Sequence, residues 1–289
     1  MTVQLPSREA NAPKPSAIDP VLLRIMQGTR QMDHRLPEWA RRSNPIVRRQ
    51  LGVYWKTLPL EMGFWLKLLL AQGALVILAV PFPIIYSLIM PVVTVSVILM
   101  PLAFAIYAQA LLQVTLQASD AMVEERRNHT LPLLLLTPYT LDHIMFSKIA
   151  ASIWRQLDNL SLVIAAHVLM SMPVLVLQYA GLFSMGESPV LTALAILLAL
   201  AGNLVRLLTE PMMVGAIGVA AGAAVPQRSV ANIAALSMLI AYFLFVNLIR
   251  LLDVSWGMRL LVDILIPLVL PLVVTCVSLK LSAWLLRRD

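Results

Sequence analysis

Charged residues are scarce in this chain, since Asp, Glu, Lys and Arg make up only 13% of its 289 residues while 60% are hydrophobic. An ordinary soluble domain is roughly 45–50% apolar and about 25% charged. A soluble fold of this size has too little polar surface to cover so many apolar side chains. The composition therefore excludes a soluble globular protein.

Cysteine is almost absent as well. Cys276 is the one cysteine and lies in an apolar run, which excludes a disulfide framework or a cysteine-based metal site within the chain. The four histidines are dispersed, and the sequence has no Gly-Lys pair for a P-loop and no G-x-S-x-G, H-E-x-x-H or C-x-x-C motif. We expect no catalytic residue, bound cofactor or metal on this chain, and hence no enzyme.

What the chain has instead is a series of long apolar runs, each near or beyond the roughly 20 residues that cross a bilayer. In lipid these runs must be helices, because every backbone polar group has to be satisfied internally and no run alternates like a barrel strand. The predicted fold class is all-α, a polytopic integral membrane protein with about six transmembrane helices. We expect the spans at 62–80, 92–118, 157–179, 190–225, 230–249 and 260–286.

The apolar run at 190–225 is longer than one span requires. As a single helix it would reach roughly 54 Å, whereas the hydrocarbon layer is about 30 Å thick. Arg206, Glu210 and Pro211 interrupt it. The run is a broken helix or a span followed by a re-entrant piece, and periodicity does not choose between them. Arg206 and Glu210 are four residues apart, which predicts an intramembrane ion pair, with a functional role or a simple span boundary as alternatives.

Basic residues are concentrated at the N-terminus, where the first 61 positions hold ten of the 22 Lys and Arg against five acids. Basic residues beside spans stay cytoplasmic, so we expect both termini in the cytoplasm of a multi-pass protein of the cell's inner (plasma) membrane. We expect residues 1–20 to form a disordered tail. Residues 21–61 are predicted to form an amphipathic interface segment, or alternatively a generic basic flank, and residues 62–289 the six-span domain. Apolar residues interleave the arginines, which argues against a nucleic-acid partner.

Three glutamines recur every fourth residue in the second expected span, at Gln109, Gln113 and Gln117. Side chains four residues apart share one face of a helix. The stripe predicts a polar lining for a substrate path or a subunit interface. The alternative is interhelical hydrogen bonding near the cytoplasmic end of the span.

A short charged segment, Glu124 to Lys148, lies between the second and third expected spans. Glu124, Glu125, Arg126 and Arg127 form a compact charged group that a cytoplasmic partner can contact, and the leucines that follow are suited to anchor it in lipid or against neighbouring helices. This arrangement predicts a segment on the membrane face that transmits force.

The order of residues in this segment resembles the coupling segment of type-2 ABC exporter permeases. The matching positions are Glu125, Arg126, Thr130, Leu131, Leu134, Leu135, Thr137, Pro138, Ile144 and Lys148. The segment departs from the family pattern where His129 and Ser147 replace glycines and Pro132 replaces an acid. Two weaker similarities accompany it: Asn44 to Leu51 is similar to the family's cytoplasmic interface helix, and Val225 to Ala241 resembles its junction between the fourth and fifth spans.

The resemblance implies the membrane-spanning permease subunit of an ABC exporter, with a cytoplasmic interface helix before the first span and a coupling helix between the second and third. A separate P-loop ATPase would hold ATP and Mg and hydrolyse the ATP, and a second copy or a paralogous permease would complete the transporter in the lipid bilayer. The implied ATPase-coupling residues are Glu124, Glu125, Arg126, Arg127, Thr130, Thr137, Pro138 and Lys148. The three departures motivate an alternative, a non-transporting scaffold or accessory subunit of a larger membrane complex that retains the permease fold.

Overall fold

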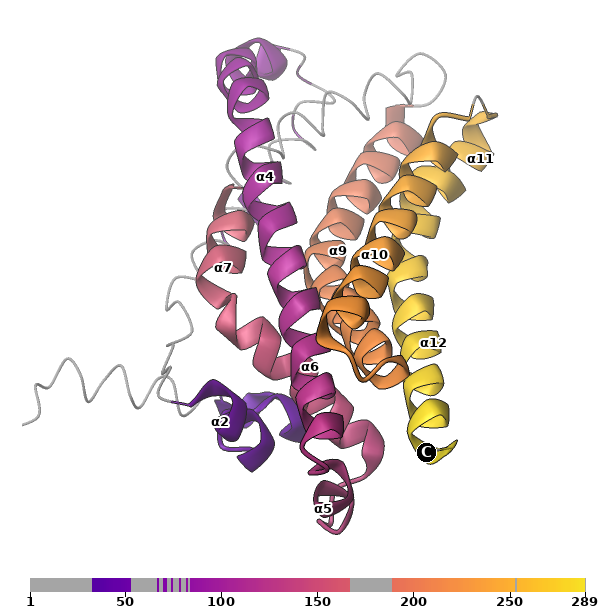
Figure 1. The fold of residues 1–289 in the computed structure, drawn as a ribbon. Coiled ribbons are helices and arrows are strands. Elements are labelled where there is room, and N and C mark those ends of the chain that lie inside the picture. Colours follow the sequence, from indigo (N-terminus) through magenta and orange to yellow (C-terminus); the bar gives the residue numbers. More distant parts are fainter. Residues whose placement is uncertain are drawn as a thin grey trace, which may run out of the picture.

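The computed structural model describes residues 33–52, 84–166, 189–252 and 254–288, together with a few single positions between 67 and 82. All regular elements within these residues are helices, as predicted for an all-α fold (Figure 1). In chain order they are η1 (Glu38–Ala40), α2 (Pro45–Leu51), α4 (Ile84–Arg127), α5 (Leu131–Leu135), α6 (Leu141–Arg155), α7 (Leu157–Ala166), α9 (Pro189–Ala224), α10 (Arg228–Arg250), α11 (Trp256–Leu260), the π-helix η3 (Leu261–Leu265) and α12 (Ile266–Arg288).

Four of these helical stretches are long and apolar enough to cross a membrane, which makes this a membrane protein. They are Met100–Arg127, Leu194–Ala224, Arg228–Arg250 and Gly257–Arg288. The last two agree with the spans predicted at 230–249 and 260–286. The predicted first span and residues 167–179 of the predicted third lie outside the continuously described residues, as do the predicted tail and most of the interface segment.

The run at 190–225 forms one continuous helix, α9, rather than the predicted broken helix or span followed by a re-entrant piece. Pro211 lies inside this helix without ending it. Pro211 is buried in the bundle, and transmembrane helices accommodate proline where neighbouring groups satisfy the backbone carbonyl that it frees.

Helix α4 extends beyond both ends of the second span predicted at 92–118. Its candidate membrane-spanning stretch among the described residues, Met100–Arg127, overlaps most of that prediction. Beyond Ala118, the Asp120 side chain pairs with Arg228 on α10. The helix therefore has no need to stop where its hydropathy falls.

Helix α9 is the most buried of the four candidate spans and contacts α4, α6, α10 and α12. Two glycines, Gly218 and Gly222, bring it into close contact with α4. A Cβ built at Gly222 would lie 2.6 Å from the carbonyl oxygen of Ser119, and one at Gly218 would collide with the carbonyl oxygen of Thr115. In lipid no hydrophobic force drives helices together, so they associate through the close van der Waals packing that small residues permit.

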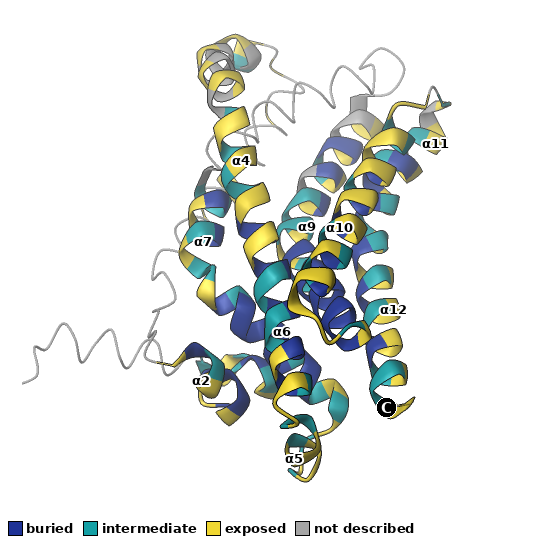
Figure 2. Ribbon diagram, viewed as in Figure 1, coloured by how far each residue is buried: buried dark blue, intermediate teal, exposed yellow. Residues whose placement is uncertain are grey.

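Helices α2, α5 and α6 gather at the end of the bundle where α12 terminates (Figure 1). Buried residues concentrate where α4, α6 and α9 meet, with Met122, Ile149 and Val219 in one apolar cluster (Figure 2). Short helix α2 lies against α6, and the indole nitrogen of Trp154 donates to the carbonyl oxygen of Ala40 at 2.8 Å. This end of the molecule is therefore built as one packed unit.

Candidate functional site

A buried ion pair joins the end of α4 to α6. The Lys148 side chain is completely buried, and its Nζ lies 3.1 Å from Glu125 Oε1 and donates to the carbonyl oxygen of Ala121, also at 3.1 Å. The hydroxyl of Thr130 donates to the second carboxylate oxygen of Glu125. Burial lowers the pKa of the Lys148 ammonium, and the Glu125 carboxylate opposes this shift. The pair clamps α6 onto α4 at the start of the loop that carries α5.

The turn after α4 holds one residue, His129, in the left-handed backbone conformation. The amide of Thr130 donates to the carbonyl of Glu125 and the amide of His129 to that of Arg126, which is a Schellman motif. His129 occupies its left-handed position with a φ of 52°. Glycine adopts this backbone conformation without a Cβ penalty, and histidine is tolerated there.

Helix α2 is held to the same site from the other side. The side chain of Asn44 caps α2 by accepting from the amide of Ile46 at 2.9 Å, and Pro45 occupies the first turn. The amide nitrogen of Asn44 then faces α6, 3.1 Å from Ser147 Oγ. Arg49 extends from α2 to within 3.7 Å of the Glu125 carboxylate. Ser147 thus contributes a hydrogen-bond acceptor for the residue that caps α2.

The four consecutive charges, Glu124 to Arg127, do not form the single exposed group that the sequence suggested. Glu124 and Arg127 are exposed, whereas Glu125 is buried in the ion pair. Arg126 turns toward α9 and donates to the carbonyl oxygen of Ala223 at its C-terminal end. Charge density along the sequence carries no information about these directions, because they depend on where α6 and α9 lie.

Helix α5 protrudes at this end of the bundle (Figure 1). Leu133, Leu135 and Leu136 have 64%, 48% and 83% of their surface exposed, so they do not anchor the segment against the helices that the structure describes. Leu131 does pack against the apolar cluster of α4, α6 and α9. Thr137 ends the short helix by donating to the carbonyl of Leu134, and the following Pro138 is exposed.

A second ion pair at this end links α4 with α10, and sequence analysis missed its acidic partner. The guanidinium of Arg228 binds both carboxylate oxygens of Asp120, with Nε 2.6 Å from Oδ1, and Asn232 donates to the same carboxylate at 3.1 Å. Both charged residues stand at the ends of apolar runs, which is the signal that would have suggested a pair. The bidentate geometry fixes the start of α10 against α4.

Deeper in the bundle, Tyr107 of α4 meets the Arg206–Glu210 pair of α9. Arg206 Nε lies 3.0 Å from Glu210 Oε1, so the structure places the two predicted partners in contact. The Tyr107 hydroxyl donates to the other oxygen of Glu210. Glu210 is buried, and the Arg206 guanidinium offsets its charge while the Tyr107 hydroxyl donates a hydrogen bond, as an acid within a membrane requires.

Replacing Tyr107 by phenylalanine should lower the free energy of unfolding by about 1–3 kcal/mol, because it leaves an oxygen of a buried carboxylate without its donor. Thermal unfolding of the protein in detergent measures the change. Tyr242→Phe is the matched control, since the Tyr242 hydroxyl is buried without a hydrogen-bond partner among the described residues and its removal should be nearly neutral. Equal effects of the two substitutions would contradict this account of Tyr107.

No family model, curated protein or solved structure gives a significant match to this chain. Its function has to be argued from the residues themselves. The described residues contain no group of three or more His, Cys, Asp or Glu side chains placed to hold a metal ion.

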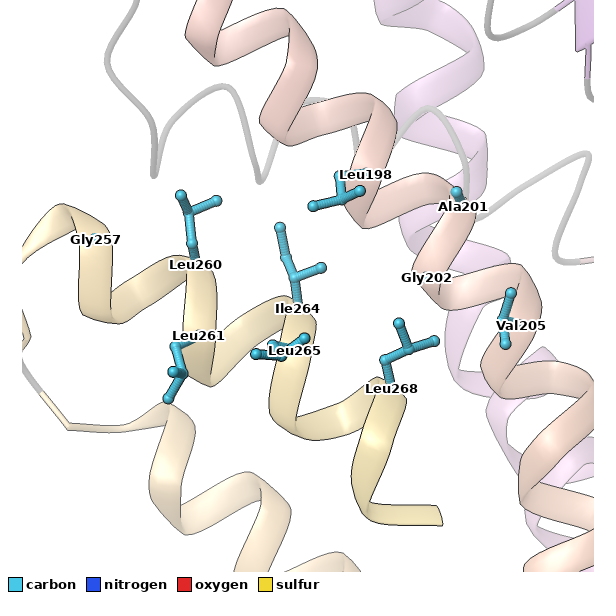
Figure 3. A pocket seen from close by; sticks show the side chains of 10 residues that line it. All are labelled: Leu198, Ala201, Gly202, Val205, Gly257, Leu260, Leu261, Ile264, Leu265 and Leu268. Carbon is cyan, nitrogen blue, oxygen red and sulfur yellow. The ribbon is translucent and has the colours of Figure 1, made fainter. Parts of the chain in front are cut away.

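The glutamine stripe on α4 faces outward for most of its length. Gln109 and Gln113 are exposed and Gln117 is half-buried. A separate hollow of about 460 Å³ lies between α9 and the α11–α12 segment (Figure 3). The side chains that line it are all apolar and include Leu198 and Ile264, so it offers space for hydrocarbon and no polar side chain that could orient a ligand.

Proposed function

We propose that this chain is the membrane-spanning permease subunit of an ABC exporter, which moves its substrate with ATP hydrolysed by a separate P-loop ATPase subunit. The observation that carries the proposal is helix α5, an exposed apolar element held rigidly at one end of the bundle by the Glu125–Lys148 clamp. An exposed leucine patch rimmed by charge suits a protein partner better than water. Exposed Glu124 and Arg127 supply that rim.

The connections around α5 suit it to transmit force into the membrane. Helix α4 runs without interruption from the α5 loop across the bundle, and its glycine contacts couple it closely to α9. Movement of α5 by an ATPase would therefore move α4 as a rigid rod rather than bend a loop. In this proposal α5 is the coupling helix and α2 the cytoplasmic interface helix.

The proposed topology adds spans at 62–80 and 157–179 to the four candidate spans, giving six crossings. Both termini then lie in the cytoplasm of a cell whose inner (plasma) membrane contains the protein. A second copy or a paralogous permease completes the pair, and the ATPase subunits bind ATP and Mg on the cytoplasmic side.

The scaffold alternative derives from the three departures in the coupling segment, and each departure has a local explanation. His129 occupies a left-handed turn and Ser147 accepts a hydrogen bond from Asn44. Pro132 lies in the first turn of α5, where its missing N–H costs no helical hydrogen bond. None of the three disrupts the path from α5 to α4.

Purification in mild detergent should recover a P-loop ATPase at one copy per copy of this chain. Recovery of redox or biosynthetic subunits without an ATPase would support the scaffold instead. In the recovered complex, Leu133→Ala with Leu136→Ala should reduce substrate-stimulated ATP turnover about tenfold or more, because interface energy concentrates in a few central apolar residues.

The matched control is Leu251→Ala with Leu252→Ala, two exposed leucines of the connection between α10 and α11 at the opposite end of the bundle. This pair should leave ATP turnover unchanged. The α5 leucines are a sharper choice than Glu125, because substituting that buried carboxylate alters stability as well. Unchanged turnover in the α5 variant would refute the exporter assignment.

A further inference from the structure

Helix α10 carries a tyrosine whose hydroxyl is buried inside the bundle. Tyr242 is 7% exposed and lies in the apolar cluster that α4, α9 and α10 form together, with Leu111 and Met213 among its members. The Tyr242 hydroxyl makes no hydrogen bond among the described residues. Burying a hydroxyl without a partner costs free energy, so such a group in the interior of a membrane protein calls for a physical explanation.

Tyr242 lies at the same depth in the bundle as the other tyrosine of this region, Tyr107. The Asp120–Arg228 pair joins α4 and α10 at one level. From that level, each tyrosine is about 20 Å along its own helix at 1.5 Å per residue. Both tyrosine hydroxyls lie within electrostatic range of the Glu210 carboxylate. The two tyrosines therefore come from two helices to the same acidic group.

The hydrogen bonds of Glu210 use only one of these tyrosines. The Tyr107 hydroxyl donates to one carboxylate oxygen, and Arg206 Nε lies 3.0 Å from the other. Helix α10, which carries Tyr242, contacts both α4 and α9 (Figure 1). Each carboxylate oxygen has two lone pairs and accepts from more than one direction. A second tyrosine thus stands beside an acceptor that is bonded to the first.

Helix α9 has a point of weakness directly after Glu210. Pro211 has no N–H, so the backbone carbonyl four residues before it loses its helical hydrogen bond, and helices bend most readily at such positions. Gly218 and Gly222 hold the part of α9 that follows Pro211 against α4. The part that precedes Pro211 carries Arg206 and Glu210. A bend at Pro211 would therefore move this ion pair relative to Tyr107 of α4.

We propose that Tyr242 is a second hydrogen-bond donor for Glu210, which replaces Tyr107 when α9 bends at Pro211. A carboxylate within a membrane is costly unless it is paired, so a bend that simply broke the Tyr107 bond would be opposed. Exchange of one tyrosine for the other keeps the carboxylate bonded in both arrangements of the helices. Tyr242 is then a positioning residue, whose hydroxyl stabilises the bent arrangement and not the one described above. Its use during transport rests on the proposed exporter function, whereas the exchange itself does not.

A double-mutant cycle tests the exchange without any ATPase. Tyr242→Phe alone should leave the unfolding equilibrium unchanged, whereas in a Tyr107→Phe background it should favour unfolding by about tenfold more, because Glu210 then has no tyrosine donor left. Tyr107→Phe alone still lowers stability, since Tyr242 reaches Glu210 only after the helices shift. Titration of the four purified proteins with SDS in mixed micelles measures these differences.

Tyr139→Phe is the control for this cycle. Tyr139 precedes α6, where its ring stacks on His143 at 4.7 Å, far from Glu210 along the bundle. This substitution should have the same effect in the wild-type and Tyr107→Phe backgrounds, because distant sites are additive. If Tyr242→Phe is equally neutral in both backgrounds, Tyr242 does not donate to Glu210 and the proposal is overturned.

ATP turnover in the complex tests the exchange during transport. Tyr242→Phe should lower the maximal rate of substrate-stimulated ATP hydrolysis about tenfold, while KM for ATP and thermal stability stay unchanged, because only the bent arrangement uses the hydroxyl. Full turnover of Tyr242→Phe in a complex whose α5 leucine variant loses turnover would overturn the role in transport and leave the exporter assignment standing. A coupled double-mutant cycle with no ATPase recovered would instead support the exchange and refute the exporter.

Discussion

Lys148→Met is expected to lower the free energy of unfolding by about 3–5 kcal/mol, because it leaves the Glu125 carboxylate buried without its ammonium partner. Lys148 is completely buried, and Arg49, the other cation near Glu125, is 3.7 Å away and largely exposed. A surface arginine cannot replace a buried ammonium at full strength, since water screens it. The clamp between α4 and α6 should therefore open first, and α5 with it.

Thermal unfolding in detergent measures this loss, and Lys280→Met, at an exposed lysine of α12, is the matched control with little expected effect. Glu125→Gln combined with Lys148→Met should recover much of the stability, because a neutral pair of similar volume removes both buried charges. A single Lys148→Met variant as stable as the wild type would refute the clamp.

The pH dependence of Glu125→Gln follows from the same pair. Glu125 raises the pKa of Lys148 against the effect of burial, so its removal lowers that pKa further from the ordinary 10.5. The unfolded chain then binds a proton that the folded protein releases, and stability rises with pH through the folded pKa up to the ordinary value. The variant's deficit relative to wild type should shrink on raising the pH, whereas Lys148→Met should show no such recovery.

Gly218→Ala is expected to destabilise the bundle by about 1–3 kcal/mol or more, even though alanine is the better helix former. A Cβ at this position would collide with the backbone carbonyl of Thr115 and lie 3.1 Å from the Cβ of Ala118, so the clash cannot be relieved by turning a flexible side chain. Helices α4 and α9 would have to separate, and the apolar cluster around Met122 would lose its close contacts.

Gly202→Ala on the same helix is the control for this prediction. The nearest atom to a Cβ there is Ile264 Cγ2 at 3.8 Å, an ordinary van der Waals distance. This substitution should be neutral or stabilise the protein by up to about 1 kcal/mol through helix propensity. Thermal unfolding of the two variants side by side checks the difference, and a destabilised Gly202→Ala with an unaffected Gly218→Ala would contradict the packing described for α9.

Hydropathy located the membrane-spanning part of the chain well where the ends of a run are charged. Helix α10 begins at Arg228 and ends at Arg250, close to the predicted 230–249, because a basic residue closes the run at each end. Hydropathy does not set the end of helix α4, which continues past the predicted span end at residue 118 to Arg127. Near that end, Glu125 is buried against Lys148 of α6, and a short window of sequence does not contain a partner 23 positions away.

The glutamine stripe also depends partly on sequence and partly on packing. The spacing of Gln109, Gln113 and Gln117 predicts that they share one helix face, and α4 is helical throughout this stretch. Only the packing of α4 shows that this face turns outward. The alternative of hydrogen bonds to other helices of this chain has no support among the described residues. The direction in which a helix face points depends on which side of α4 the neighbouring helices occupy, so only the tertiary structure determines it.

The order of residues alone singled out the charged segment between α4 and α6, which includes Glu125, Thr130 and Lys148. Only the tertiary structure decided what each one contacts: Glu125 and Lys148 neutralise each other in the interior, and Thr130 completes the pair. The exposed leucines of α5 are left as the surface available to a partner. The apolar composition by itself determined an all-helical membrane protein, because lipid permits few other backbone arrangements. The partner of each buried charged side chain was decided only by the tertiary structure, because it depends on which helices meet.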